Sequence, residues 1–208
     1  KSPYTGGHCQ RVPSLTMMLA DAVNATDDGV FASFKMSERD RYELKIAGLL
    51  HDCGKVTTPV HVVDKATKLQ TLFDRIELLD TRFEVVRRDA ELAMLHSVLE
   101  GADRAVAERK LKETLRGIDG DRAFLRRVNV GGESMSAEDQ ARVGLISQRY
   151  PWRNPVGEQV DFLSVDELEN LTIRAGTLMQ AERETINYHI VATIKMLESL
   201  PWLKHLKH

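Results

Sequence analysis

Apolar residues recur at intervals of three or four positions through most of this 208-residue chain, which is the spacing of one face of an α-helix. The longest such stretch begins at Thr71 and breaks near Glu100 to Asp103, so it predicts a helical hairpin. A second amphipathic helix covers 179–200 and should end before Pro201. No segment shows the strict alternation of a half-buried strand. The pattern therefore predicts an all-α fold.

Two helices are predicted before the hairpin. The first contains Pro13 near its start, where proline is tolerated. The second begins after the capping residue Ser37 and should end at Gly54. The segment 56–69 has no helical period and is expected to form an ordered loop. One apolar face of the first helix is predicted to contain Val12, Leu15, Leu19 and Val23.

The charge balance and the cysteine content limit the kinds of partner. With 29 basic and 31 acidic residues, the chain lacks the excess positive charge that favours binding to a nucleic-acid polymer. Its two cysteines, Cys9 and Cys53, form neither a disulfide framework nor a zinc-finger pattern. No apolar run reaches the ~18 residues of a membrane span. We therefore expect a cytoplasmic protein with no membrane segment in this chain.

The sequence LLHDCGK places His51 beside Asp52 at the end of an apolar helical run. Adjacent residues on a helix point about 100° apart, so they can flank one metal ion only near a helix end or a bend. An imidazole nitrogen and a carboxylate oxygen suit divalent iron, manganese or zinc. Lys55 follows closely enough to meet an anionic substrate. For the pair taken alone, a chance dipeptide with a core histidine is the competing interpretation.

A metal site needs more ligands than this pair supplies. The candidates are His8, at the start of the first helix, and His189, next to the apolar face of the last helix. Taken singly, each is more readily explained as a hydrogen-bonded core or surface histidine. His61 lies in the predicted loop and His96 in the charged hairpin, so both are expected at the surface.

Three blocks of the sequence, in this order, resemble motifs of the HD-GYP family of HD phosphohydrolases: HCQRV, AGLLHDCGKVTTPVHVVDKATKL and ERETINYHIVATIKMLESLPW. They lie within roughly the first 70 and the last 35 residues. The resemblance implies an all-α, metal-dependent bacterial signalling enzyme that hydrolyses cyclic di-GMP to pGpG and sometimes to GMP. It also implies a cluster of two or three divalent metal ions, usually iron or manganese.

The resemblance assigns roles to individual residues. Asp52 matches the carboxylate that bridges two ions, and Lys55 matches the lysine that meets the phosphate, so these two are the expected catalytic residues. Lys65 matches a lysine near the substrate, which makes Lys55 and Lys65 the expected substrate-binding residues. The expected metal ligands are His8, His51, Asp52 and His189.

Two departures from the family pattern change these expectations. Members with three ions carry a glutamate four residues before the first histidine, where this chain has Tyr4, so we expect two ions. The family continues with an HHE pair of ligands and a GYP loop, and this chain ends before them. His205 and His208 do not replace those ligands. The chain as given is therefore expected to hold an incomplete site and to show little or no turnover by itself.

The segment between the motifs is far longer than the family pattern requires. We expect a first part of the core at 1–70, a helical insertion at 71–174 and a second part of the core at 175–208. The result would be an HD-domain helical bundle interrupted by a long helical hairpin. The insertion is either a solvated spacer or a surface for homodimerisation or sensor coupling. An upstream sensor or receiver domain is expected in the parent protein.

The predicted function is a metal-dependent phosphodiesterase that acts on cyclic di-GMP. Two alternatives remain open from the sequence. One is a catalytically inactive HD-GYP-like module that binds a nucleotide or a partner, and this alternative does not require a filled metal site. The other is an HD phosphohydrolase that acts on another nucleotide, against which the KATKL block after HDCGK argues.

Overall fold

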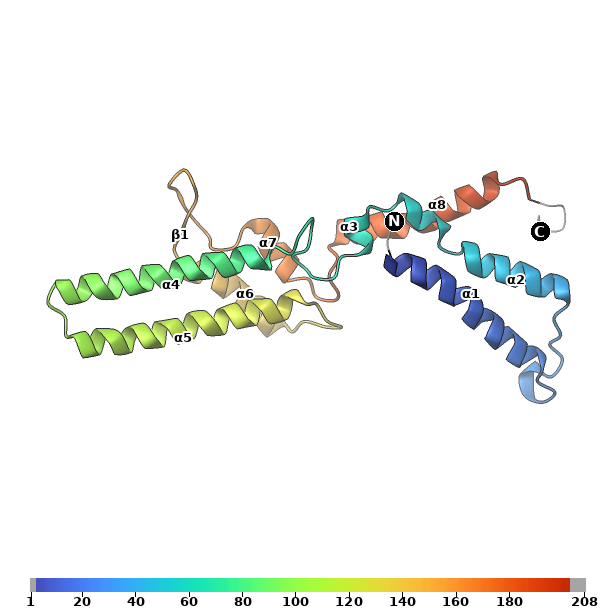
Figure 1. Ribbon diagram of the computed structural model, residues 1–208, viewed down its shortest axis with the longest axis horizontal. Helices are drawn as coiled ribbons and strands as arrows, with labels where there is room; N and C mark the ends of the chain where they lie inside the picture. The colour runs from blue at the N-terminus through green and yellow to red at the C-terminus, as the bar shows by residue number, and fades with distance from the viewer. Residues whose placement is uncertain (1–2, 203–208) are drawn as a thin grey trace. The chain divides into compact units, whose positions relative to one another are not determined.

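The computed structural model describes residues 3–202 and consists of two compact units, which Figure 1 shows as ribbons. Unit 1 comprises Lys1–Asp64 with Gln180–His208, and unit 2 comprises Lys65–Met179. Both are built almost entirely from helices, which confirms the predicted all-α class. Within 3–202, no helix combines the length and the apolar character that a membrane crossing requires. The assignment of 71–174 as an insertion stays a prediction.

Unit 1 contains three long helices and three short helical segments. The long helices α1 and α2 lie side by side, and α8, from the C-terminal part of the chain, packs against η2 and α3. The elements are α1 (Pro3–Asn24), η1 (Gly29–Phe31), α2 (Glu38–Leu50), η2 (Cys53–Thr57), α3 (Val60–Val63) and α8 (Gln180–Ser199). The prediction of a loop at 56–69 was therefore partly wrong, because this segment contains the end of η2 and the single helical turn α3.

Local sequence signals explain most boundaries of unit 1. The hydroxyl of Ser37 accepts a hydrogen bond from the Asp40 amide, and the Asp40 carboxylate accepts one from the Ser37 amide, which is a capping box at the start of α2. α8 ends at Ser199, before Pro201, as predicted. Pro13, however, lies in the interior of α1 and not near its start. Its ring packs against α2 at Gly48, where an added Cβ would lie 3.3 Å from the Pro13 Cα.

Few apolar side chains of unit 1 are buried. Val62 and Ala192 are 5% and 6% exposed, whereas Leu15 and Leu19 of the predicted apolar face of α1 are 56% and 70% exposed. Ile194 of α8 is also half exposed. Within the described residues, unit 1 therefore lacks a large apolar core and depends more on contacts in which helix backbones approach one another closely.

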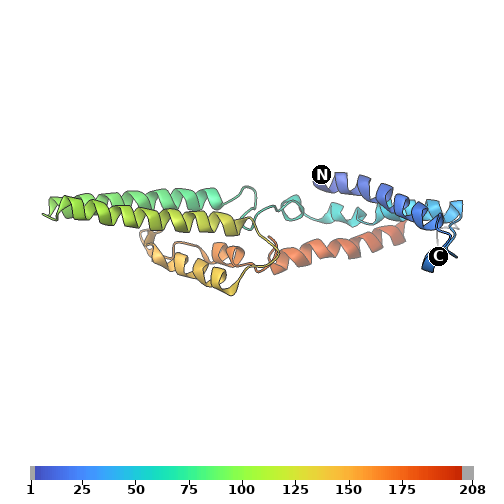
Figure 2. The ribbon, with the colours of Figure 1, turned by 90° about the horizontal axis from the view of Figure 1, so that it is seen from below.

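Unit 2 is organised around the predicted hairpin. Two long antiparallel helices are joined at 100–103, where the sequence predicts a break, and α6 and α7 lie along one side of their base (Figure 2). The elements are α4 (Ile76–Leu99), α5 (Arg104–Asn129), α6 (Ala137–Arg149), β1 (Trp152–Arg153), β2 (Gln159–Val160) and α7 (Val165–Leu171). The outer face of α4 exposes Leu78, Val85, Leu92 and Leu99 at seven-residue intervals. A homodimer through the hairpin stays a prediction.

The core of unit 2 centres on three aromatic rings. Phe83 and Phe162 have ring centroids 4.8 Å apart, and Tyr150 lies 5.3 Å from Phe162 in an edge-to-face arrangement. Beneath the rings the buried carboxylate of Asp121 accepts hydrogen bonds from the Tyr150 hydroxyl and from Arg149. The charge of Asp121 is therefore paired where water is excluded.

The short strands β1 and β2 lie in a stretch where the sequence shows no strand pattern. They pair antiparallel, with Trp152 opposite Val160. The turn between them is stabilised by Asn154, whose side-chain oxygen accepts from the amides of Val156 and Glu158. Gly157 supplies the positive φ of 88° that the turn requires. Such a short hairpin leaves too few alternating residues for a periodic signal in the sequence.

We expect Phe83→Ala to lower the free energy of unfolding of unit 2 by about 3–5 kcal/mol, because the substitution removes a ring that is 1% exposed and leaves a cavity. Urea unfolding followed by circular dichroism measures the change. The control is Leu92→Ala on the same helix, at a side chain that is 52% exposed, where little change is expected. Equal effects for the two variants would contradict the position of the core.

We expect the stability of unit 2 to depend on the ionisation of Tyr150 at alkaline pH. Burial, and then the hydrogen bond to Asp121, raise the pKa of Tyr150 well above its usual range. An acid whose pKa is raised on folding stabilises the fold fully below its unfolded pKa of about 10, and that contribution is lost as the pH rises further. Urea unfolding at pH 8 and pH 11 should show a larger loss for the wild type than for Tyr150→Phe. The same loss in both would contradict this assignment.

Candidate metal centre

The end of α2 positions the two adjacent residues of the HD pair. The helix ends at Leu50, His51 is its C-terminal capping residue, and Asp52 already has φ −116° and ψ 15°. This change of backbone direction lets two neighbouring side chains reach the same point, which a continuous helix would prevent. The sequence predicted that this helix ends at Gly54, but it ends at Leu50, directly before the pair.

Gly54 has a different role from the helix terminator that the sequence predicted. It lies in η2, is buried, and does not have a positive φ. A Cβ added to Gly54 would lie 2.1 Å from the carbonyl oxygen of His189 and 2.5 Å from the amide nitrogen of Thr193. Glycine is required here because the backbone of α8 packs directly against the turn. This contact brings His189 to Asp52.

Three of the predicted metal ligands come together around the fourth, Asp52. The Nε2 atoms of His8 and His51 lie 3.3 Å and 3.1 Å from Asp52 Oδ2. The other carboxylate oxygen, Oδ1, lies 3.4 Å from Nε2 of His189. One ligand atom each from His8, His51 and Asp52 lies within 4.8 Å of the others, which is a spacing that could hold an ion. Helix α1 supplies His8, the C-terminal cap of α2 is His51, and α8 supplies His189.

The hydrogen bonds of the imidazoles favour a cation at this point. Nδ1 of His51 lies 2.8 Å from the carbonyl oxygen of Gly48, and Nδ1 of His189 contacts the carbonyl oxygen of Ile186. Because a carbonyl oxygen only accepts, each Nδ1 is assigned a proton, which leaves Nε2 as the atom of each ring that would bind an ion. These Nε2 atoms lie 3.1 Å and 3.4 Å from the carboxylate oxygens of Asp52. A divalent ion between them would take both kinds of atom as ligands.

Lys55 contacts the same carboxylate. Its Nζ donates a hydrogen bond of 2.7 Å to Asp52 Oδ2. Burial disfavours the charged carboxylate, but the hydrogen bond and charge of Lys55 and the nearby imidazoles outweigh it, so the pKa of Asp52 is lowered. Asp52 is therefore ionised at neutral pH, which is the form that could bind a metal ion.

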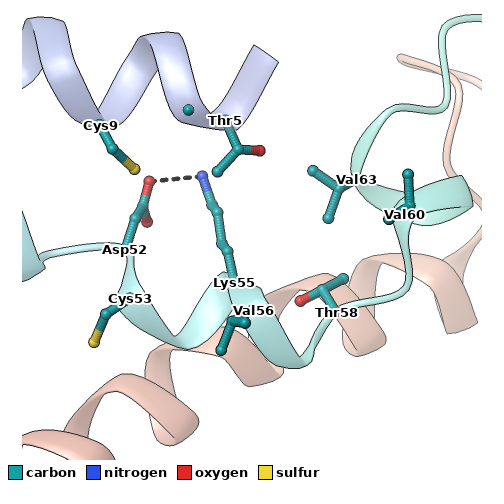
Figure 3. Close-up of a pocket in the computed structure, with 10 residues that line it drawn as sticks. Thr5, Cys9, Asp52, Cys53, Lys55, Val56, Thr58, Val60 and Val63 are labelled. Carbon is teal, nitrogen blue, oxygen red and sulfur yellow. Dashed lines mark hydrogen bonds and ion pairs between the residues drawn. The ribbon is translucent and has the colours of Figure 1, made fainter. Parts of the chain in front are cut away.

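A cavity of about 260 Å³ opens beside Asp52 and Lys55 (Figure 3). Figure 3 shows the Lys55 amine and the Asp52 carboxylate on one side of it, with Val60 and Val63 on the opposite side. The same cavity is lined by Cys9, whose side chain extends from α1 towards Asp52. The cavity thus combines a charged wall and an apolar wall, which suits a ligand with a phosphate and a less polar part.

The remaining predicted residues lie elsewhere. Lys65 is in unit 2, where it is buried and donates a hydrogen bond of 3.0 Å to Asn170 Oδ1. Its role in substrate binding stays a prediction. His61 and His96 are exposed, as expected. His205 and His208 lie outside the described residues.

Sequence reasoning missed two contributors to the site. Thr193 is 7% exposed and its hydroxyl oxygen accepts a 2.9 Å hydrogen bond from the Gly54 amide. Cys9 lines the cavity one position after His8. The sequence could have indicated Thr193, because it lies four residues after His189, one helical turn further along the same face.

A comparison with known protein families gives a match that includes three of the proposed ligands. The HD domain family model matches residues 5–123, more than half of the chain, and this span includes His8, His51 and Asp52. The chain belongs to the HD domain family. The HD domain is also similar to 3′3′-cGAMP-specific phosphodiesterase 3 of Vibrio cholerae, with 38% identity over 69 residues. That match covers 33% of this chain and 13% of the length of the relative. No solved structure gives a significant match.

We expect Gly54→Ala to destabilise unit 1 by roughly 1–3 kcal/mol or more, because the new methyl group would collide with the backbone of α8, which cannot rotate away. Gly117→Ala in α5 is the control, since an added Cβ there meets nothing within 4 Å. That control should be stabilised by about 0.5–1 kcal/mol, as expected for glycine inside a helix. Urea unfolding measures both, and a neutral Gly54→Ala would contradict the close approach.

Proposed function

We propose that this HD domain belongs to a metal-dependent phosphodiesterase of the HD-GYP type that hydrolyses a cyclic dinucleotide, with cyclic di-GMP as the first candidate substrate. The observation that carries the proposal is the arrangement around Asp52, where the Nε2 atoms of three imidazoles lie 3.1–3.4 Å from the two carboxylate oxygens. The similarity to a phosphodiesterase named for 3′3′-cGAMP supports the same substrate class.

The proposed ligand set divides between the two oxygens of Asp52. His8 and His51 would hold one divalent ion at Oδ2, and His189 would contribute to a second ion at Oδ1. Iron or manganese suits this mixture of imidazole and carboxylate ligands. Such ions lower the pKa of bound water and neutralise charge on phosphoryl oxygens.

Lys55 would bind the phosphodiester. Its ammonium group lies at the cavity wall and reaches the Asp52 carboxylate, so a small rotation of a flexible side chain can direct it to an anionic oxygen. The charge of Lys55 would then stabilise negative charge that develops on the phosphoryl group. The apolar wall formed by Val60 and Val63 would face the less polar part of the substrate.

The experiment that tests the function combines metal analysis with an activity assay on the full-length protein. Elemental analysis should find about two equivalents of iron or manganese, the number proposed for a bridged site. Cyclic di-GMP, 3′3′-cGAMP and a nucleoside monophosphate are then offered separately, and products are separated by chromatography and identified by mass. Formation of a linear dinucleotide supports the proposal. A metal-free protein without turnover would favour a regulatory module, and turnover of the monophosphate alone would favour another HD phosphohydrolase.

We expect Asp52→Ala to abolish both metal retention and hydrolysis, because the residue would serve both ions. Lys55→Ala should keep the metal and lower kcat by about 10²–10³-fold, the usual cost of losing one group that stabilises transition-state charge. Matched controls are His96→Ala and Lys45→Ala, at exposed positions away from the cluster. Loss of metal in Lys55→Ala would show that Lys55 is structural, and wild-type turnover in Asp52→Ala would contradict the site.

A further inference from the structure

A hydrogen bond holds α8 to the η2 turn that follows His51 and Asp52. It involves none of the proposed metal ligands. The Gly54 amide donates to the hydroxyl oxygen of Thr193 at 2.9 Å, and the two residues are 139 positions apart. Thr193 is 7% exposed and Gly54 is buried, so water cannot readily replace this bond. The two backbones approach closely here, since a Cβ added to Gly54 would lie 2.5 Å from the amide nitrogen of Thr193.

Each of the two residues in this bond lies close in the sequence to a proposed metal ligand. Gly54 follows Asp52 by two residues in the η2 turn, and Thr193 follows His189 by four residues, one turn along the same face of α8. The hydrogen bond and the 3.4 Å contact between His189 Nε2 and Asp52 Oδ1 therefore close a small ring of interactions. Sliding or rotation of α8 would break both together.

The two sides of the Asp52 carboxylate do not depend on α8 equally. The contacts to Oδ2 come from His8 on α1, from His51 and from Lys55, none of which is on α8. The contact to Oδ1 comes from α8 through His189. A change in the placement of α8 should therefore affect one half of the site and spare the other.

We propose that Thr193 is a positioning residue for the second ion: its hydroxyl oxygen fixes α8 on the Gly54 amide and so holds His189 at Asp52 Oδ1. The inference rests on the proposed two-ion function. Removing the acceptor leaves the Gly54 amide buried without a partner, so α8 must shift to admit water or another acceptor.

Thr193→Val tests the inference, because valine keeps the shape of threonine and removes the acceptor. Calorimetric titration of the metal-free protein with Mn²⁺ should show one of two binding steps weakened by about 10–100-fold, the usual effect of losing an orienting partner, with the other step unchanged. Thr193→Ser keeps the oxygen and should restore both steps. The control is Thr185→Val, an exposed position on α8 whose hydroxyl bonds only to Ala181 of its own helix.

Several outcomes would overturn the inference. The first is that Thr193→Val binds Mn²⁺ like the wild type. The second is that both binding steps weaken equally, and the third is that Thr193→Ser does not restore the weakened step. A wild-type protein that takes up one ion or none would overturn the two-ion function itself. In that case hydrogen exchange of the Gly54 amide in metal-free protein decides the positioning role: faster exchange in Thr193→Val than in Thr185→Val supports it, and equal exchange overturns it.

Discussion

The packing of α8 directly on Gly54 is the contact on which the candidate site depends. Asp52 lies at the end of α2 and His189 on the last helix, so nothing local in the chain brings them together. The missing side chain of Gly54 lets the carbonyl oxygen of His189 approach to a point that any Cβ would occupy. The buried hydrogen bond from Gly54 to Thr193 then fixes the approach. The metal-site geometry is thus a consequence of backbone packing.

The electrostatics of the site follow from that geometry. A buried carboxylate is costly unless it is paired, and Asp52 is surrounded by Lys55 and by imidazoles whose Nδ1 atoms are committed to backbone carbonyls. These hydrogen bonds orient the rings before any ion binds, which reduces the reorganisation that binding requires. The carboxylate stays ionised because Lys55 offsets its burial.

The two units of the chain are stabilised in different ways. Unit 2 encloses a conventional core in which Phe83, Tyr150 and Phe162 pack on one another above a paired Asp121. Unit 1 buries few apolar side chains and depends on close helix contacts, at Gly48 against Pro13 and at Gly54 against α8. Substitutions at these glycines therefore act on the site directly, whereas substitutions in the aromatic core act on the stability of unit 2.

The sequence by itself determined the all-α class, the cap at Ser37 and the break between α4 and α5, and it selected His51 and Asp52 as candidates, because each is a local signal within one or two helical turns. It gave α2 a wrong end, showed no signal for the β1–β2 hairpin and missed Thr193. Leu15 and Leu19 had the spacing of a buried face but are exposed, since periodicity states which residues share a face and not what covers it. Only the tertiary structure decided that Gly54 admits α8 and that His189 reaches Asp52. Contacts between residues 139 positions apart leave no periodic trace in the chain.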